Sequence, residues 1–241
     1  MNALQRSLEA ADGLYTEFNL GNGLMREAAS RCPVIKNTGK KGDNRDIRGI
    51  LQNDTAQFTS EPLLNQIHEE VAEHLRQHYG ITAETFMSHE EWVLAPTNGR
   101  GFTGQKHRDT TTTQPGILTV LLFFGDRKQQ EGRGYGGVKV WRNSQRLFQG
   151  HDSIDHNIKN ASRELRKHDG GWGKEANLKE FNCVVFDSRL IHESLPHTQH
   201  TPRASLTFYL RFEGSPHIND ADVENYLKPE ECGMINMQKY L

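Results

Sequence analysis

A histidine and a carboxylate two residues apart, His107 and Asp109, stand just before a long apolar run and are the residues best suited to hold a metal ion. In an extended segment, residues i and i+2 project from the same face, so both side chains can bind one ion while Arg108 points away. A further imidazole must then come from elsewhere in the chain. His192 is the natural candidate because it closely follows a second apolar run, residues 183–187.

Two imidazoles and one carboxylate on one face of a metal leave the opposite coordination positions open, which is typical of non-haem Fe(II) oxygenases. An open metal implies a co-substrate. The chain has 12 histidines, so other choices of the distant ligand exist, and His197 and His200 are alternatives to His192. These two lie in the loop between Pro196 and Pro202, where solvated polar residues are expected. Position therefore favours His192.

The elements that must position these residues are strands. After Gly80, five short runs rich in valine, leucine and aromatic residues predict an antiparallel sandwich or barrel: 91–95, 117–124, 137–141, 181–187 and 205–212. The run 117–124 is apolar on both faces, which predicts a central strand with a covered back. The last run alternates, and its polar face carries Arg203, Ser205, Thr207, Tyr209 and Arg211. We expect that polar face to line a cavity for a polar ligand.

Helices are predicted ahead of the strands. Residues 1–32 have apolar positions at three- and four-residue spacing, which indicates an amphipathic helix broken around Gly21-Asn22-Gly23. The segment 61–79 has the clearest helical spacing, and Gly80 follows it as a stop. These helices would cover one sheet. Residues 143–180 form a hydrophilic insertion that is too long for a hairpin and is therefore expected to be a lid or binding loop.

Composition bounds the class of protein. With 241 residues, we predict one domain over 1–241, in which 1–80 is mostly helical support, 90–213 is the strand core and 214–241 is a tail without a chemical motif. The formal net charge of −2 shows no basic excess for nucleic acid or an acidic membrane surface. The 3 scattered cysteines fit a reducing cytosol, and no apolar stretch reaches membrane-spanning length. We therefore predict a cytoplasmic protein without a nucleic-acid or membrane partner.

The ordered set of motifs resembles the Fe(II)- and 2-oxoglutarate-dependent oxygenase superfamily, on its prolyl-hydroxylase-like or phytanoyl-hydroxylase-like side. The resemblance covers roughly residues 90–213. It rests on the following residues: His107-Arg108-Asp109, the apolar strand after them, Gly136-Gly137, Val184-Val185-Phe186-Asp187 leading to His192, and Arg203-Ala204-Ser205. The ordered set with an Arg-X-Ser eleven residues past His192 is far more specific than His-X-Asp alone.

The resemblance implies a fold and a co-substrate. The fold would be mainly β with flanking α-helices, a double-stranded β-helix of the jelly-roll, cupin-like kind. His107, Asp109 and His192 would hold Fe(II). Arg203, helped by the Ser205 hydroxyl, would pair with the distal carboxylate of 2-oxoglutarate, since a guanidinium fork matches a carboxylate in two-point contact. With O2, the reaction would release succinate and CO2 and oxidise a C–H bond of the substrate.

The outcome and the substrate are less specified. Asp109 argues against halogenation, because related halogenases have a small residue in its place. Hydroxylation is expected, although desaturation, epoxidation and ring closure use the same ligands. A small molecule such as an amino acid or natural-product intermediate is favoured, and a peptidyl, prolyl-type substrate is the alternative. Candidate substrate contacts are Arg211, Trp172 and Trp92. Arg211 could instead be a surface residue of a strand end, and Trp172 could pack the insertion onto the barrel.

Two rival functions stay open. A cupin-like metalloenzyme would use a related jelly-roll without 2-oxoglutarate and would not need Arg203 and Ser205 so placed. A catalytically silent jelly-roll would bind a ligand or partner protein and show neither tight Fe(II) binding nor succinate formation. Nucleic-acid demethylation is disfavoured, because the segment 203–211 does not match the longer arginine motif of that branch. The oligomeric state is not predicted.

Overall fold

The structure is a computed structural model that describes residues 3–31, 50–52, 62–95, 106, 108–109, 116–124, 135–147, 165, 173–178, 180–197 and 203–212. The predictions for His107, for Trp172 and for the tail 214–241 lie outside these residues, as does most of the insertion 143–180. For Trp92, Arg203 and Ser205, only the backbone lies within them.

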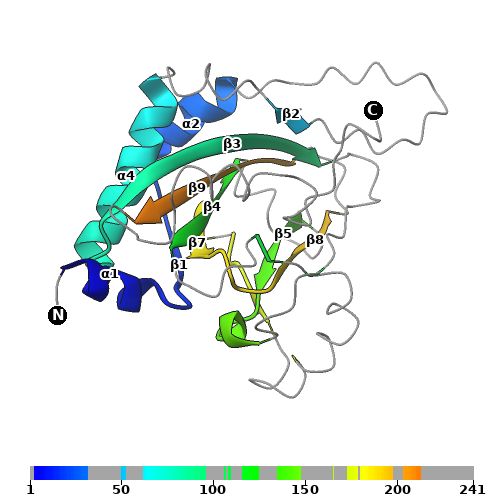
Figure 1. Cartoon of the computed structure of the whole chain (residues 1–241). Coiled ribbons are helices and arrows are strands. Elements are labelled where there is room, and N and C mark those ends of the chain that lie inside the picture. The colour runs from blue at the N-terminus through cyan, green and yellow to red at the C-terminus, as the bar shows by residue number, and fades with distance from the viewer. Residues whose placement is uncertain are drawn as a thin grey trace.

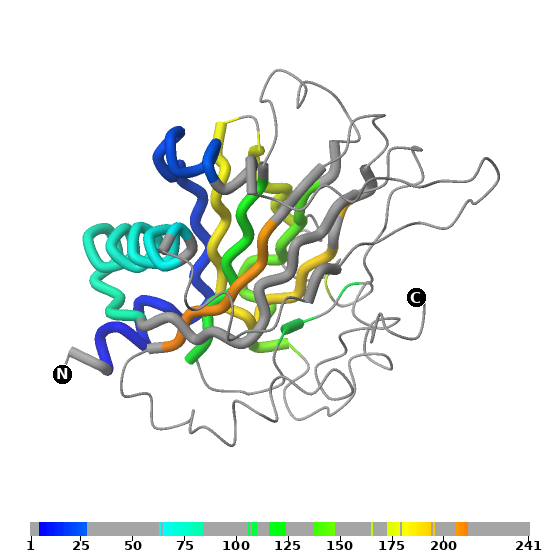
Figure 2. The backbone as a smooth tube through the Cα atoms, turned by 90° about the horizontal axis from the view of Figure 1, so that it is seen from above, coloured from blue at the N-terminus to red at the C-terminus, as the bar shows by residue number. Residues whose placement is uncertain are grey.

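Six strands form one antiparallel sheet in the order β1-β7-β4-β9-β3-β2. Their bounds are Tyr15–Phe18 for β1, Ile50–Gln52 for β2, Ala83–Ala95 for β3, Ile117–Phe124 for β4, Cys183–Asp187 for β7 and Arg203–Phe212 for β9. Figure 2 shows β1, β7, β4 and β9 side by side. The predicted central strand is confirmed, because β4 pairs with β7 on one side and β9 on the other.

A smaller sheet of three strands lies against the first, in the order β6-β5-β8. Its strands are β5 (Tyr135–Val140), β6 (Lys174–Glu175) and β8 (His192–His197), and a 3-10 helix, η2 (Ser144–Arg146), follows β5. One apolar cluster joins the two sheets: Phe123, Val138, Val140, Leu178, Val184, Phe186 and Leu190. The chain is therefore layered, with an apolar interior between two sheets.

Three helices lie on the other side of the six-stranded sheet (Figure 1). They are α1 (Ala3–Ala11), α2 (Asn22–Arg31) and α4 (Pro62–Tyr79), and α4 confirms the helix predicted over 61–79. Ile67, Val71 and Leu75 of α4 are 0% exposed and pack on the even-numbered residues of β4 and β9. Burial of each such side chain stabilises the fold by about 1.5–3 kcal/mol. The apolar stripe of β9 thus faces the helices, and its polar face is turned toward the second sheet.

The first segment differs from its prediction. The chain leaves α1 at Ala11, turns at Gly13 and enters β1, so that Tyr15 lies in a strand rather than in a helix. Gly13 has a φ of 71°, and a Cβ there would lie 2.4 Å from Nε2 of Gln145. The pairing of β1 with β7, far along the chain, overrides the local helical spacing. Among the described residues, no helix has the length and apolar character that crossing a bilayer requires.

Candidate metal centre

Asp109 and His192 lie together in the interior. Oδ1 of Asp109 is 3.4 Å from Nε2 of His192, and each residue is 5% exposed. Two donor atoms bound to one ion at about 2.1 Å and at a right angle to each other lie about 3 Å apart. The pair therefore has the chemistry and the spacing of two adjacent metal ligands, as the sequence predicts for these two residues.

His192 is oriented by contacts at the start of its own strand, β8. It is the first residue of β8 and pairs with Val140 of β5, and its Nδ1 lies 3.1 Å from the carbonyl oxygen of Leu190. Because a carbonyl only accepts, this contact places the hydrogen on Nδ1 and the lone pair on Nε2, the atom that faces Asp109. The ring packs on Phe186 at a centroid distance of 4.8 Å. Nε2 is accordingly the ring atom of His192 that would bind a metal.

Asp109 is held at its backbone and at its carboxylate. Its backbone N–H donates to the carbonyl of Ser188 at 3.0 Å. Oδ2 accepts a hydrogen bond of 2.6 Å from Thr119 of β4, while Oδ1 faces His192. The two carboxylate oxygens therefore have different surroundings.

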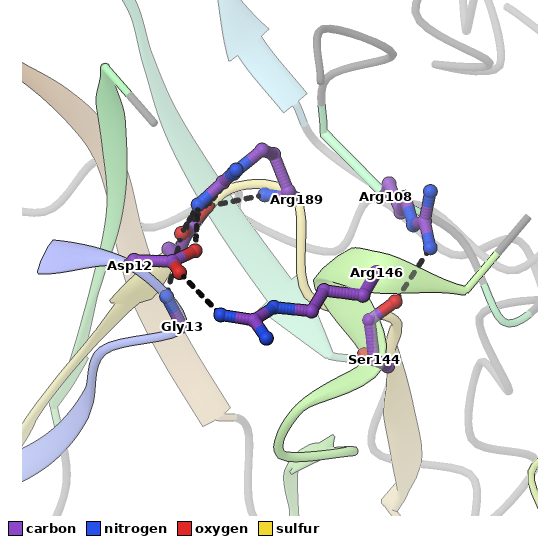
Figure 3. A network of polar contacts seen from close by, with 7 residues as sticks. Asp12, Gly13, Arg108, Ser144, Arg146 and Arg189 are labelled. Carbon is purple, nitrogen blue, oxygen red and sulfur yellow. Dashed lines mark hydrogen bonds and ion pairs between the residues drawn. The ribbon is translucent and has the colours of Figure 1, made fainter. Parts of the chain in front are cut away.

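Arg108 turns away from the pair, as the alternation predicts. Its guanidinium donates to the carbonyl oxygen of Ser144 at 2.6 Å (Figure 3) and also to that of Leu147. Burial and the nearby charge of Arg189 lower the pKa of Arg108 to about 10, so the side chain stays cationic at neutral pH. Arg108 accordingly anchors the segment that carries Asp109 to η2.

Ser144 joins the two segments that carry the candidate ligands. Besides accepting from Arg108, it accepts a hydrogen bond of 2.7 Å at Oγ from the backbone N–H of Ile191, next to His192. Its hydroxyl donates to the carbonyl of Trp141 at 2.6 Å, and the residue is 0% exposed. The 3-10 helix thus holds the Asp109 segment and the start of β8 in one arrangement, a role that sequence reasoning missed.

An ion network around the buried residues Asp187 and Arg189 fixes the turn between β7 and β8. Asp187 accepts from the backbone N–H of Gly13 at 2.9 Å and from the Arg189 guanidinium at 2.5 Å, and Arg189 also reaches Asp12 at 2.7 Å. Arg146 adds a contact of 3.1 Å to Asp12 (Figure 3). Burial alone would raise the pKa of Asp12, but hydrogen bonds from the two arginines outweigh it and lower that pKa below its usual value. The network ties the end of α1 to the turn that leads into His192.

Sequence reasoning also missed this network. The Asp-X-Arg spacing of residues 187 and 189, directly after a strand, was a local signal for part of it. The partners Asp12 and Gly13 had no signal, because they come from the other end of the chain.

The predicted co-substrate residues lie on β9, beside β4. Ser205 pairs with Phe123, and Tyr209 pairs with Thr119, the residue that contacts Asp109. Positions 203, 205 and 209 are an even number of residues apart, so they lie on the same face of β9. The backbone therefore places positions 203 and 205 on the face of the sheet that carries Thr119. Their roles stay predictions.

The predicted substrate contacts are placed unequally. Arg211 is half-buried, pairs with Ile117 and shares the parity of Tyr209. Trp92 pairs with Leu206, which belongs to the face of the sheet that the helices cover. The strand register therefore adds no support for a substrate contact at position 92. Both roles stay predictions, as does that of Trp172.

The third predicted ligand, His107, lies outside the description, and within the described part of the chain no group of three His, Cys, Asp or Glu residues gathers around a metal position. Its neighbours in the sequence are anchored beside the pair. Lys106 makes an ion pair of 3.0 Å with Glu193, and Arg108 binds η2. Two of the three predicted ligands are thus found together, and the third stays a prediction.

Comparisons with known proteins identify the fold. No protein-family model matches the chain, and no curated protein sequence matches it. AviO1 from Streptomyces viridochromogenes Tue57 is similar in structure, with a TM-score of 0.61, 16% identity and coverage of 90% of this chain and 96% of that one. The epimerase SnoN, in complex with Fe3+, alpha ketoglutarate and nogalamycin RO, has a TM-score of 0.57, 16% identity and coverage of 88% and 84%.

HygX from Streptomyces hygroscopicus, with nickel and 2-oxoglutarate bound, has a TM-score of 0.54, 9% identity and coverage of 83% of each chain. At such identities, these likenesses establish the fold. The chain has the sheet-rich fold of AviO1, SnoN and HygX, which SnoN and HygX use to hold a metal and 2-oxoglutarate.

Proposed function

We propose that this chain is an Fe(II)- and 2-oxoglutarate-dependent oxygenase that hydroxylates an unactivated C–H bond of a small molecule and releases succinate and CO2. The observation that carries the proposal is the buried contact of 3.4 Å between Nε2 of His192 and Oδ1 of Asp109. This pair fits part of a metal site because imidazole nitrogen and carboxylate oxygen are both metal donors. The Leu190 carbonyl orients the imidazole, and the Thr119 hydroxyl orients the carboxylate.

The metal would be held by Asp109 and His192, with His107 as the third ligand. When bound, Fe(II) would activate O2, which is the oxidant both for 2-oxoglutarate, converted to succinate and CO2, and for the C–H bond of the substrate. The protein residues hold and enclose the site. Phe186 packs on the His192 ring, and the apolar cluster between the sheets excludes water from one side of it.

Arg203 and Ser205 are proposed to bind the distal carboxylate of 2-oxoglutarate. Their positions on β9 share the parity of Tyr209, which pairs with Thr119 across the sheet. A guanidinium is the group best matched to a carboxylate within a barrel, because it donates two parallel hydrogen bonds. Arg203→Ala is expected to raise the 2-oxoglutarate concentration needed for half-maximal turnover, and an unchanged requirement would assign that role to Arg211.

The architecture is proposed to be a double-stranded β-helix, formed as a single domain by residues 1–241. The support is the pair of facing sheets, the likeness to AviO1 over 90% of the chain, and a core cluster that joins Ala11 of α1 to Leu210 of β9. A small-molecule substrate is proposed because SnoN holds nogalamycin RO on the same fold. A peptidyl substrate is the alternative, and the cytoplasmic location stays a prediction.

The test is anaerobic reconstitution with Fe(II) and then 2-oxoglutarate. We expect a weak visible charge-transfer band, followed by succinate when air is admitted, with both signals lost in Asp109→Ala. Glu73→Ala is the matched control, because it removes an exposed carboxylate of α4 that pairs with Arg76 and takes no part in holding the His192–Asp109 pair. Iron binding without the charge-transfer band and without succinate would indicate a cupin-like metalloenzyme. A protein that binds no iron would indicate a catalytically silent jelly-roll.

A further inference from the structure

Three buried polar side chains form a hydrogen-bonded row that ends on the candidate ligand Asp109. Oγ1 of Thr119 lies 2.6 Å from Oδ2 of Asp109, and Oγ of Ser188 lies 2.8 Å from Oγ1 of Thr119. Asp109 is 5% exposed, Thr119 1% and Ser188 0%. Polar groups buried this deeply are costly unless paired, so these bonds determine how the three side chains are oriented.

The direction of each hydrogen bond follows from the groups. An ionised carboxylate only accepts, so the single hydroxyl hydrogen of Thr119 is donated to Oδ2 of Asp109. Thr119 then has no hydrogen left for Ser188, and Ser188 must donate to Thr119. The row therefore runs in one direction, from Ser188 through Thr119 to Asp109. Each bond polarises the next, which strengthens the one that reaches the carboxylate.

We propose that this relay, defined as Ser188, Thr119 and their two hydroxyl hydrogen bonds, orients the Asp109 carboxylate for metal binding. The inference rests on the proposed function. Thr119 holds Oδ2, so Oδ1 is the oxygen presented beside Nε2 of His192. With Oδ2 held by Thr119, Asp109 would bind a metal through Oδ1 alone. Thr119 and Ser188 are thus positioning residues.

The surrounding backbone holds the relay in place. The N–H of Ser188 donates to the carbonyl of Ile117 at 3.1 Å, and the carbonyl of Ser188 accepts from Asp109 N–H at 3.0 Å. Thr119 lies in the middle of β4, between Phe186 of β7 and Tyr209 of β9. Threonine is branched at Cβ and therefore stiff at χ1, which suits a hydroxyl that must keep one direction. The relay is accordingly held by backbone hydrogen bonds of Ser188 and by the restricted χ1 angle of Thr119.

The test compares two substitutions at residue 119 in the full chain. Thr119→Val keeps the shape and removes the hydroxyl, whereas Thr119→Ser keeps the hydroxyl. Titration with Mn(II), an air-stable probe, measures the metal dissociation constant, and thermal unfolding without metal measures folding. We expect Thr119→Val to weaken Mn(II) binding by about 10- to 100-fold, the usual effect of removing a partner of a metal ligand. Thr119→Ser should bind Mn(II) like the wild type.

Thr16→Val is the matched control. Thr16 is also a buried threonine of the six-stranded sheet, and its Oγ1 accepts a hydrogen bond of 2.6 Å from Tyr79. It pairs with Val185, whose side chain belongs to the helix-covered core, so its hydroxyl lies on the face away from Asp109. This control should lose stability and keep the Mn(II) affinity of the wild type.

Three results would overturn the relay: Mn(II) affinity in Thr119→Val within about twofold of the wild type, an equal loss in Thr16→Val, or no rescue by Thr119→Ser. If Thr119→Val does not fold, Ser188→Ala decides, since it removes the outer hydrogen bond alone. Weaker Mn(II) binding in Ser188→Ala supports the relay, and unchanged binding overturns it. A wild-type protein that binds no Mn(II) would instead overturn the proposed function together with this inference.

Discussion

His192 and Asp109 acquire their orientation in different ways. The imidazole of His192 is directed by a carbonyl two residues earlier in the same segment, so its orientation is largely local. The carboxylate of Asp109 is directed by a hydroxyl on β4, and its backbone is bound to the turn after β7. The position of the Asp109 carboxylate therefore depends on three separate segments, and we expect Asp109 to be the more sensitive of the two candidate ligands to substitutions around it.

The histidine can be tested against another histidine of the same chain. His192→Ala should abolish Fe(II) binding and succinate formation, because it removes one of two adjacent donors. His74→Ala is the control, since His74 lies on α4 and stacks on Phe18 at a ring distance of 3.6 Å. Calorimetric metal titration of both variants gives the result. Equal iron affinity in His192→Ala and His74→Ala would contradict the assigned ligand.

The 3-10 helix η2 and the turn between β7 and β8 act together as the frame of the candidate site. Ser144 binds Arg108 on one side and Ile191 on the other, so one buried serine joins the two segments that carry Asp109 and His192. The turn is held from the opposite side by Asp12 and Gly13 at the end of α1. The positions of Asp109 and His192 thus depend on η2 and on the end of α1, which lie outside the strands of the two sheets.

Removing the hydroxyl of Ser144 tests this frame. Ser144→Ala leaves the buried N–H of Ile191 without its acceptor, which should lower the free energy of unfolding by about 1–3 kcal/mol. Because Ile191 precedes His192, metal affinity should fall as well. Urea unfolding and Mn(II) titration give the two quantities. A loss of stability with unchanged Mn(II) affinity would show that η2 supports the fold and not the site.

The Asp12 contacts make a stability prediction that depends on pH. The folded pKa of Asp12 is lowered, so its contribution is fully present above the unfolded value of about 4 and is lost as pH falls through the folded pKa. Asp12→Asn should therefore lower the free energy of unfolding by about 1 kcal/mol at neutral pH. The difference from the wild type should shrink in acid below about pH 4. Urea unfolding across this range measures it, and a pH-independent difference would contradict the role of the Asp12 charge.

In the described part of the molecule, an apolar layer lies on each face of the six-stranded sheet. The layer between the helices and the six-stranded sheet includes Leu75, which is 0% exposed. The layer between the two sheets includes Phe186, which also packs on His192. We infer that the first layer mainly provides stability, whereas the second both stabilises the sheets and shapes the candidate site.

A pair of core substitutions separates these tasks. Leu75→Ala should cost about 2–5 kcal/mol of stability and leave the metal affinity of the folded protein unchanged. Phe186→Ala should cost about 3–5 kcal/mol and also weaken metal binding, because the His192 ring loses its support. Chemical unfolding and metal titration at a temperature where both variants are folded give the comparison. Equal metal affinity in the two variants would contradict the division.

Much of the fold was predictable because burial leaves periodic marks in a sequence. The helix Pro62–Tyr79, the strand Ile117–Phe124 and the alternation of β9 each follow from the spacing of apolar residues. The closeness of Asp109 and His192 was predicted from motif order and is found in the structure. The contributions of His107, Arg203 and Ser205 stay predictions.

Other features depend on which distant segments meet. Tyr15 begins a strand and does not continue a helix because β7 is available as a partner, and Thr119 binds Asp109 because β4 runs beside the turn that holds Asp109. The spacing of apolar residues within a segment indicates which face of that segment is buried. It depends only on residues that are close together in the sequence. The partner of a polar side chain depends on which groups the fold brings near it. The relay, the role of Ser144 and the Asp12 network therefore follow only from the packed structure.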